Sequence, residues 1–364
     1  MAALILSLLL ANSSYNDHFE SILSYTTGIG SMQMSLTHWI NDGLMAIFFL
    51  LVGLEIKKEL VEGELADFKK AALPIIAAIG GMIVPALIYT AINWGSPTAH
   101  GWGIPMATDI AFAIAVLSLL GNRVHPALKV FLIALAIVDD LGAILVVAIF
   151  YTAEIHWLAL GIAFLLLGIL ITLNKLKVMS LWIYLIPGLV LWYFMHHSGI
   201  HATIAGVLLA FCIPLKHKSG ASPLNQLEHI LAKPVNLIIM PVFALANTNI
   251  SLNAEMFSSI FSSLGLAIIL GLFVGKTIGV FGSSFLAVKL GVAKLPKNTS
   301  WATLAATGTL AGIGFTMSIF IAMLSFDDKT YVDTAKISIL TASFLSGLVA
   351  YTLLRLLSKS PKVK

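Results

Sequence analysis

The sequence predicts an all-α membrane protein, and three observations support this. Of the 364 residues, 59% are hydrophobic and only 10% are charged. Apolar stretches of about 20 residues, long enough to cross a bilayer as a helix, recur along the whole chain. The 28 glycines and 12 prolines are typical of packed, interrupted transmembrane helices. A soluble domain is therefore excluded, and the scattered lysines argue against a nucleic-acid surface.

About twelve membrane-spanning segments result when the chain is divided at charged and Gly-, Pro- or Asn-rich breaks. The first is short and lacks the positive start of a signal peptide, so either the chain begins upstream of Met1 or this helix is a stub. The single Cys212 excludes a disulfide within one chain. The segments cover residues 2–11, 36–61, 71–92, 102–120, 127–151, 157–173, 181–195, 200–214, 223–246, 264–288, 301–326 and 334–357.

Basic residues fall on alternate loops of this division. All but three of the 21 Lys and Arg residues lie on one side; the exceptions are Lys276 inside a span and Lys329 and Lys336 on the other side. The positive-inside rule assigns the basic side to the cytoplasm, and both termini with it. On the outer side, residues 28–36 alternate polar and apolar side chains around small residues, which predicts a short hairpin; a plain loop is the alternative.

Asp139 and Asp140 lie side by side in the apolar run 131–151. A bare carboxylate at mid-membrane costs about 3 kcal/mol or more. One interpretation is a buried acid that is hydrogen-bonded to a neighbouring helix for packing. Two ionisable groups at one depth favour an ion or proton site instead. Because they are about 100° apart around the helix, the two can face different partners.

Two of the predicted spans are interrupted. Gly101, Gly103 and Pro105 break the first near its middle, just before Thr108 and Asp109, and Gly312 and Gly314 break the second. Close packing through small residues is an alternative for the second break. However, the breaks occupy corresponding places in two three-span blocks, 71–151 and 264–357, that enter the membrane from opposite sides. Such inverted repeats with interrupted helices point to the substrate site of a transporter.

Lys276 is the one base at membrane depth, and a buried ammonium needs a carboxylate or carbonyl partner. If the two interrupted helices cross at their breaks, two positive and two negative helix ends meet there, each with about half a charge. Asp109 would then neutralise the positive ends and Lys276 the negative ends. Alternatively, Lys276 pairs with Asp139.

Further charged residues lie nearer the ends of the spans. Asp42 is close to the outer end of segment 36–61, and Glu55 and Glu59 are one turn apart near its cytoplasmic end. Glu228 and His229 begin a later helix on the same side. These residues are either solvated ion pairs or a cluster whose protonation gates the cytoplasmic funnel. Histidine is the side chain that changes charge near neutral pH, which suits the second interpretation.

The chain resembles the NhaA family of Na⁺/H⁺ antiporters along nearly its whole length. The matching motifs are WINDGLMA at 39–46, GLE at 53–55, ATDIAFA at 107–113, the aspartate-pair segment 134–143, SGIHAT at 198–203, GK at 275–276 and GIGFTMS at 312–318. The departures are Thr277, where the family pattern has a proline after the lysine, His217 and Ser219, where it has an acid and a histidine, and Ala232, where it has a second histidine.

The resemblance implies a bacterial inner-membrane antiporter, not an enzyme, that exports Na⁺ or Li⁺ in exchange for H⁺ and needs no cofactor. Its expected partners are those ions, the lipid bilayer and a second copy that pairs through the outer hairpin. The resemblance makes Asp140 the principal cation ligand, Asp139 its proton-sharing partner, Thr108 and Asp109 neighbours of the site and Lys276 the compensating base. It assigns pH sensing to Glu55, Glu59, Glu228 and His229, and Asp42 lies in the outer funnel.

The mechanism we expect is competition between Na⁺ and protons for Asp139 and Asp140, followed by alternating access. If two carboxylates carry protons against one Na⁺, the exchange is electrogenic. Two other classes compete with this interpretation. An intramembrane aspartyl protease needs aspartates that face each other from different helices, and a channel needs a continuous pore without ion–proton competition.

Overall fold

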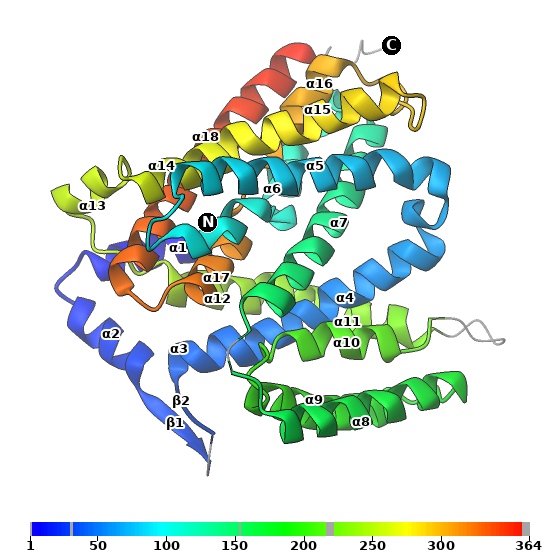
Figure 1. The fold of residues 1–364 in the computed structure, drawn as a ribbon, viewed down its shortest axis with the longest axis vertical. Coiled ribbons are helices and arrows are strands. Elements are labelled where there is room, and N and C mark those ends of the chain that lie inside the picture. Colours follow the sequence, from blue (N-terminus) through cyan, green and yellow to red (C-terminus); the bar gives the residue numbers. More distant parts are fainter. Residues whose placement is uncertain (1, 30–31, 153, 216–221, 359–364) are drawn as a thin grey trace. The chain divides into compact units, whose positions relative to one another are not determined.

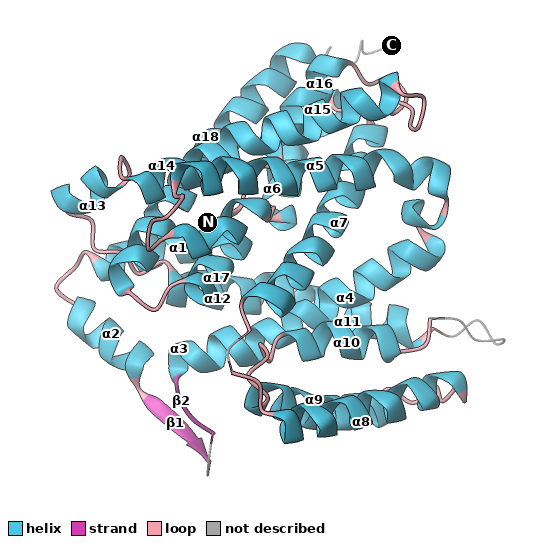
Figure 2. Ribbon diagram, in the orientation of Figure 1, coloured by secondary structure: helices cyan, strands magenta, loops and turns pink. Residues whose placement is uncertain are grey.

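The computed structural model describes residues 2–29, 32–152, 154–215 and 222–358. Helices make up most of it, and one two-stranded sheet is the β structure among these residues (Figure 2). Contacts divide the chain into two compact units, each built from two stretches of sequence. Unit 1 comprises Met1–Val61 and Val146–Ser251, and unit 2 comprises Glu62–Leu145 and Leu252–Lys364. Unit 2 therefore contains nearly all of both expected repeat blocks.

Unit 1 holds the first helices of the chain and those of its middle part. Two of its segments, η1 and η5, are π-helical turns that continue into α-helices. The elements are α1 (Ala2–Ala11), α2 (Asn16–Ser24), β1 (Thr26–Ile29), β2 (Met32–Ser35), α3 (Leu36–His38), η1 (Trp39–Leu44), α4 (Met45–Glu62), α8 (Trp157–Lys175), α9 (Trp182–His197), α10 (Ile204–Cys212), α11 (Pro223–Pro234), η5 (Val235–Ile239) and α12 (Met240–Asn247) (Figure 1).

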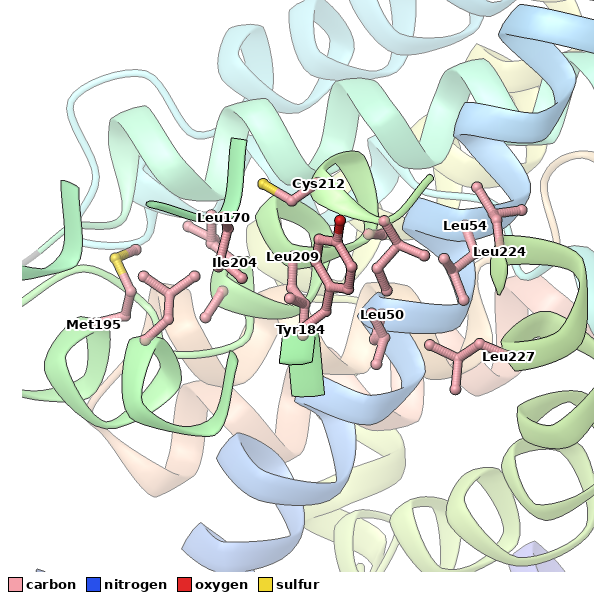
Figure 3. Packing of buried hydrophobic residues seen from close by; sticks show 14 of the residues in the cluster. Leu50, Leu54, Leu170, Tyr184, Met195, Ile204, Leu209, Cys212, Leu224 and Leu227 are labelled. Atoms are coloured by element: carbon pink, nitrogen blue, oxygen red, sulfur yellow. The ribbon is translucent and has the colours of Figure 1, made fainter. Parts of the chain in front are cut away.

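The apolar core of unit 1 forms where α4, α9, α10 and α11 meet. Figure 3 shows Leu50 and Leu54 of α4 facing the same cluster as Tyr184 of α9, Leu209 of α10 and Leu227 of α11. Leu54 and Tyr184 are fully buried. This packing fixes the apolar part of α4, so the charged residues that follow Leu54 lie at one end of the helix.

A small hairpin occupies the segment where the sequence predicts one. β1 and β2 pair antiparallel with Thr26 opposite Ser35 and Ile29 opposite Met32. Ser35 then caps α3, because its hydroxyl accepts a hydrogen bond from the His38 backbone N–H.

Unit 2 holds the remaining helices. The boundary between the units leaves the last turn of α7 in unit 1 and the last residue of α4 in unit 2. Its elements are η2 (Glu64–Ala66), α5 (Phe68–Ile92), η3 (Ala99–Met106), α6 (Ile110–Leu119), η4 (Gly121–Arg123), α7 (Pro126–Phe150), α13 (Ala254–Ser259), α14 (Ser263–Ile269), η6 (Leu270–Gly275), α15 (Lys276–Lys289), α16 (Trp301–Leu310), α17 (Phe315–Ser325) and α18 (Lys329–Leu357).

Helices α5 and α15 run side by side in unit 2 (Figure 1). Ala77 and Ala78 of α5 pack with Leu135 of α7, Val280 of α15 and Leu304 of α16 in one buried cluster. Small residues on α5 let neighbouring helices approach closely, as in other membrane bundles. The two central helices that carry Asp139 and Lys276 are held by this cluster.

Both predicted breaks occur in unit 2, with one change of place. Between η3 and α6, Ala107 and Asp109 are extended, so the chain opens after Pro105 rather than among the preceding glycines. The half before this break is a 3₁₀-helix, which suits a segment in which proline removes a backbone donor. Between α16 and α17 the axis bends by 49° at Ala311–Gly314.

Among the residues that the structure describes, seven helices are long and apolar enough to cross a membrane, or eight if the bent pair α16–α17 counts as one span. Four of the twelve expected segments fall outside this set because their helices are short or carry many charges. These are 2–11, 36–61, 181–195 and 200–214, which become α1, α3–η1–α4, α9 and α10.

Candidate functional site

Helix α7 brings Asp139 and Asp140 into the interior of unit 2. The helix is continuous over Pro126–Phe150, so the two adjacent side chains leave it in different directions. Asp139 is fully buried and Asp140 is 3% exposed. Two carboxylates in such surroundings need partners that compensate their charge.

The Asp139 carboxylate has two such partners on one oxygen. The Lys276 ammonium donates to Oδ2 and forms an ion pair with it. The Thr108 hydroxyl donates to the same oxygen at 2.8 Å. Within the described residues, Oδ1 of Asp139 is buried and accepts no hydrogen bond. Of the two partners that the sequence left open for Lys276, the structure pairs it with Asp139.

Thr108 also joins the first break to the second. Its hydroxyl lies 2.8 Å from Asp139 Oδ2 and 2.7 Å from the carbonyl oxygen of Ala311, which follows the end of α16. One hydroxyl proton can satisfy only one of these two acceptors at a time. The Thr108 oxygen thus lies where α7 and both interrupted segments come together.

Asp109 caps two helices. Its Oδ1 accepts from the Phe112 backbone N–H at 3.2 Å, at the start of α6. Its Oδ2 accepts from the Thr316 backbone N–H at 3.1 Å, at the start of α17, and from the Thr316 hydroxyl. Because helix N-termini carry positive partial charge, one carboxylate stabilises both of them. Asp109 is 2% exposed, so its partners are protein groups rather than bulk water.

Backbone contacts complete the crossing of the two breaks. The Asp109 backbone N–H donates to the Ile313 carbonyl at 2.6 Å, and the Ser318 hydroxyl donates to the Ile104 carbonyl at 2.8 Å. At Gly312 a side chain cannot be accommodated, because its Cβ would lie 2.3 Å from the Leu272 carbonyl oxygen. Gly314 is the residue before α17. The backbone groups freed at the breaks are thereby paired inside the protein, as the membrane requires.

In unit 1, Lys58 interacts with two of the residues assigned to pH sensing, Glu228 and Glu55. Lys58 Nζ lies 3.0 Å and 2.7 Å from the two carboxylate oxygens of Glu228. The Glu55 carboxylate is close enough to Glu228 and Lys58 to interact electrostatically with both. Lys57 faces another way and donates to the carbonyls of Phe211 and Ile213, at the end of α10. A cation there stabilises the negative helix end, so Lys57 is a cap rather than a member of the cluster.

The other predicted residues of unit 1 differ in exposure and in partners. His229 is exposed, and Glu59 is half-buried on α4. Asp42 lies in η1, where its Oδ2 is 3.2 Å from His196 Nδ1 and 3.6 Å from His38 Nε2. The Trp192 indole donates to the Asp42 carbonyl. Asp42 therefore belongs to a second polar group of unit 1, formed with two histidines.

Known proteins of one family are similar to this chain over nearly its whole length. A family model described as "Na+/H+ antiporter 1" matches residues 1–354. The chain is 55% identical to Na(+)/H(+) antiporter NhaA 2 of Flavobacterium johnsoniae, over 99% of this chain and 90% of that protein. It is 52% identical to NhaA of Flavobacterium psychrophilum (90% and 85%) and 49% identical to NhaA of Bordetella parapertussis (98% and 92%). The chain belongs to the NhaA Na⁺/H⁺ antiporter family. This is a family of transporters and not of enzymes.

Within this NhaA-family chain, several residues at the crossing were not singled out by the sequence. Thr316 and Ser318 lie in the motif that carries the family resemblance, yet their partners, Asp109 and Ile104, are more than 200 positions away. The signal available was the hydroxyls that follow Gly314 directly. Lys57, away from the crossing in unit 1, gave no such signal, because the run of charged residues that contains it does not distinguish one member from another.

Proposed function

We propose that this chain exchanges Na⁺ or Li⁺ for protons across the bacterial inner membrane, with Asp139 and Asp140 as the shared binding groups. The observation that carries this proposal is the buried Asp139 carboxylate at the crossing of two interrupted helices. Lys276 and Thr108 hold one of its oxygens, and Asp140 stands next to it. Membership of the Na⁺/H⁺ antiporter family supports the choice of ions.

Oxygen atoms make this place suitable for a hard cation. Na⁺ prefers oxygen ligands, and the carboxylates of Asp139 and Asp140 and the hydroxyl of Thr108 offer them. The Asp139 oxygen that is bonded to Lys276 must be released, or its other oxygen used, when a cation enters. Among the described residues no three His, Cys, Asp or Glu side chains converge as in a resident metal centre. The ion is therefore a transient substrate in this proposal.

Exchange follows from competition between the two ions. A carboxylate that holds a proton does not bind Na⁺, so each ion displaces the other. Interrupted helices permit the site to open first to the cytoplasm and then to the outside. Asp109 keeps both helix N-termini neutralised throughout, and Lys276 balances the Asp139 charge when no cation is bound.

The finer features of the proposal come from the sequence pattern and the family resemblance. Two carboxylates that carry protons against one Na⁺ make the exchange electrogenic. The Glu55, Glu59, Glu228 and His229 group regulates it by pH from the cytoplasmic side, with both termini on that side. Two copies associate through the β1–β2 hairpin. The two three-span blocks act as inverted repeats within a fold of about twelve spans.

A channel or a protease fits the site less well. Adjacent aspartates on one helix cannot share a proton face to face, as the acid pair of an aspartyl protease does. A channel has no use for a lysine that competes with the permeating cation for its carboxylate. Both alternatives predict transport or hydrolysis that does not depend on exchange with protons.

Everted membrane vesicles with an acid interior and a pH-sensitive dye test the proposal. Addition of Na⁺ or Li⁺, between about pH 6.5 and 8.5, should dissipate the gradient, and Asp140→Asn should abolish this response. The control is Asp17→Asn, because Asp17 is an exposed aspartate of α2. Absence of a response to any cation in the native chain would refute the proposal. A full response in Asp140→Asn would refute the assignment of the site.

A further inference from the structure

Thr277 follows Lys276 directly and faces a different helix. Its hydroxyl oxygen lies 2.7 Å from the Phe273 carbonyl, one turn back in η6, and 3.1 Å from the Thr309 hydroxyl oxygen on α16. Thr309 in turn lies 3.2 Å from the Ala305 carbonyl. Lys276 reaches the Asp139 carboxylate of α7, so two consecutive residues of α15 contact two different helices.

The two threonine hydroxyls have fewer protons than contacts. Three oxygen–oxygen contacts exist, but only two hydroxyl protons are available to bridge them. If Thr277 and Thr309 are hydrogen-bonded to each other, one of the two hydroxyls therefore cannot donate to the carbonyl one turn back in its own helix. Because a lone threonine in a helix usually bonds to its own preceding turn, as Thr341 does with Ile337 at 2.8 Å, the cross-helix contact is an added feature of this pair.

Helices α15 and α16 approach closely just beside this pair. At Gly308, an added Cβ would lie 3.2 Å from Val280 Cβ and 3.3 Å from the Thr277 carbonyl oxygen. The neighbouring Thr309 is 4% exposed. The hydroxyl contact is thus part of a tight, partly buried helix interface, where hydrogen bonds are stronger than in water.

The pair closes a ring of contacts around the candidate ion site. From Asp139 the ring runs through Lys276 to the adjacent Thr277, and across to Thr309. Two residues after Thr309, the Ala311 carbonyl contacts Thr108, whose hydroxyl returns to Asp139. The end of α16 at the second break is therefore linked to both partners of the Asp139 oxygen.

We propose that Thr277 is a positioning residue that, through Thr309, holds the Lys276 ammonium against Asp139 in the cation-free protein. This inference rests on the proposed exchange of cations at Asp139 and Asp140. The ammonium and the cation compete for the same carboxylate, so the strength of the lysine pair sets how much Na⁺ is needed to displace it. Thr277 thereby tunes the Na⁺ concentration at which transport is half-maximal, without touching the ion.

Removal of the Thr277 hydroxyl should make displacement of Lys276 easier. A typical net hydrogen-bond contribution corresponds to about a fivefold change in an equilibrium constant, so Thr277→Val should lower the half-saturating Na⁺ concentration about fivefold. Thr277→Ser keeps the hydroxyl and should behave like the native chain. Thr309→Val should resemble Thr277→Val, and the double variant should add little to either.

The experiment measures dye dequenching against Na⁺ concentration in everted vesicles, at one pH, for the native chain and these four variants. Thr341→Val is the matched control, because it removes a hydroxyl bonded only within its own helix α18. Thermal unfolding of the purified proteins without Na⁺ checks that all are folded. It also gives the coupling between Thr277 and Thr309 without any reference to transport.

The outcomes separate the inference from the proposed function. A lowered half-saturating concentration in Thr277→Val that Thr277→Ser does not share supports the inference. An unchanged or raised concentration, or equal effects of Val and Ser, overturns it while native transport stands. Strictly additive effects of the Thr277→Val and Thr309→Val variants overturn it as well. A native chain without any Na⁺ response overturns the proposed function, and the inference with it.

Discussion

The charged residues at the two candidate groups, one in each unit, differ in how deeply they are buried. In unit 2, Asp109, Asp139, Asp140 and Lys276 are at most 3% exposed, and Asp109, Asp139 and Lys276 contact other protein groups. In unit 1, the Lys58–Glu228 pair has side chains that are 41% and 21% exposed, and the Asp42–His196 pair 19% and 23%. Buried charges are costly to remove from water, whereas half-exposed pairs are cheap to form and to lose.

In the proposed mechanism, this contrast separates the site of exchange from the groups that regulate it by pH. Under that proposal, a cation that replaces a proton or an ammonium in unit 2 exchanges one strong interaction for another. A proton gained or lost by the Glu228 cluster changes a weak interaction that solvent already screens. The account therefore predicts large effects of substitutions at the buried charges of unit 2 and small, pH-dependent effects at the more exposed pairs of unit 1.

Removal of the buried ammonium should have the largest effect. Lys276→Met leaves Asp139 as a buried carboxylate with only Thr108 as partner, which should lower the free energy of unfolding by about 3–5 kcal/mol and abolish transport. Thermal unfolding of the purified protein measures the first effect. The double variant Lys276→Met with Asp139→Asn should regain part of the stability.

The control for this prediction lies on the same helix. Lys289 is the exposed last residue of α15, and Lys289→Met should change the stability by no more than about 0.5 kcal/mol. Equal effects at Lys276 and Lys289 would show that the ion pair with Asp139 has no energetic role.

Loss of the double cap should have an intermediate effect. Asp109→Ala leaves the backbone N–H groups of Phe112 and Thr316 without their acceptor and should cost about 1–3 kcal/mol. Asp109→Asn keeps one acceptor oxygen and should cost less. Asp67→Ala, which removes the exposed cap of α5, is the matched control and should cost about 1 kcal/mol. A smaller effect at Asp109 than at Asp67 would contradict the assigned double role.

Substitution in the half-exposed cluster of unit 1 should have the smallest effect on stability. Glu228→Gln should change the free energy of unfolding by less than about 1 kcal/mol. Its effect should be seen in the pH profile: with one carboxylate fewer nearby, Glu55 ionises more easily, so the rise of transport with pH should begin at lower pH. Glu64→Gln, which removes another surface pair with Lys70, should leave the profile unchanged. Identical profiles of all three proteins would remove Glu228 from pH sensing.

The polar residues at membrane depth were predictable because their surroundings in the sequence are apolar. Asp139, Asp109 and Lys276 could be named from that contrast alone, together with the two breaks. Their pairing was not predictable, since it depends on how α7, α15 and the interrupted helices cross. Lys276 with Asp139 and Thr316 with Asp109 are contacts over 137 and 207 positions.

Local chemistry also shifted the breaks and the lengths of helices. The first break falls at Ala107–Asp109, because Asp109 can cap α6 only if it precedes the first turn. Lys57 became a helix cap because the end of α10 happens to lie beside it, which a run of charged residues does not reveal. Helix ends that depend on partners distant in sequence are the features hardest to predict from the sequence of a membrane protein.

The central claim is that Na⁺ and protons compete for Asp139 and Asp140. Isothermal titration of the purified protein with Na⁺, in two buffers of different ionisation enthalpy, measures the protons released per bound ion. The account predicts that binding releases protons and weakens as the pH falls, and that Asp140→Asn binds no Na⁺. Binding without proton release, or unchanged binding by Asp140→Asn, would contradict it.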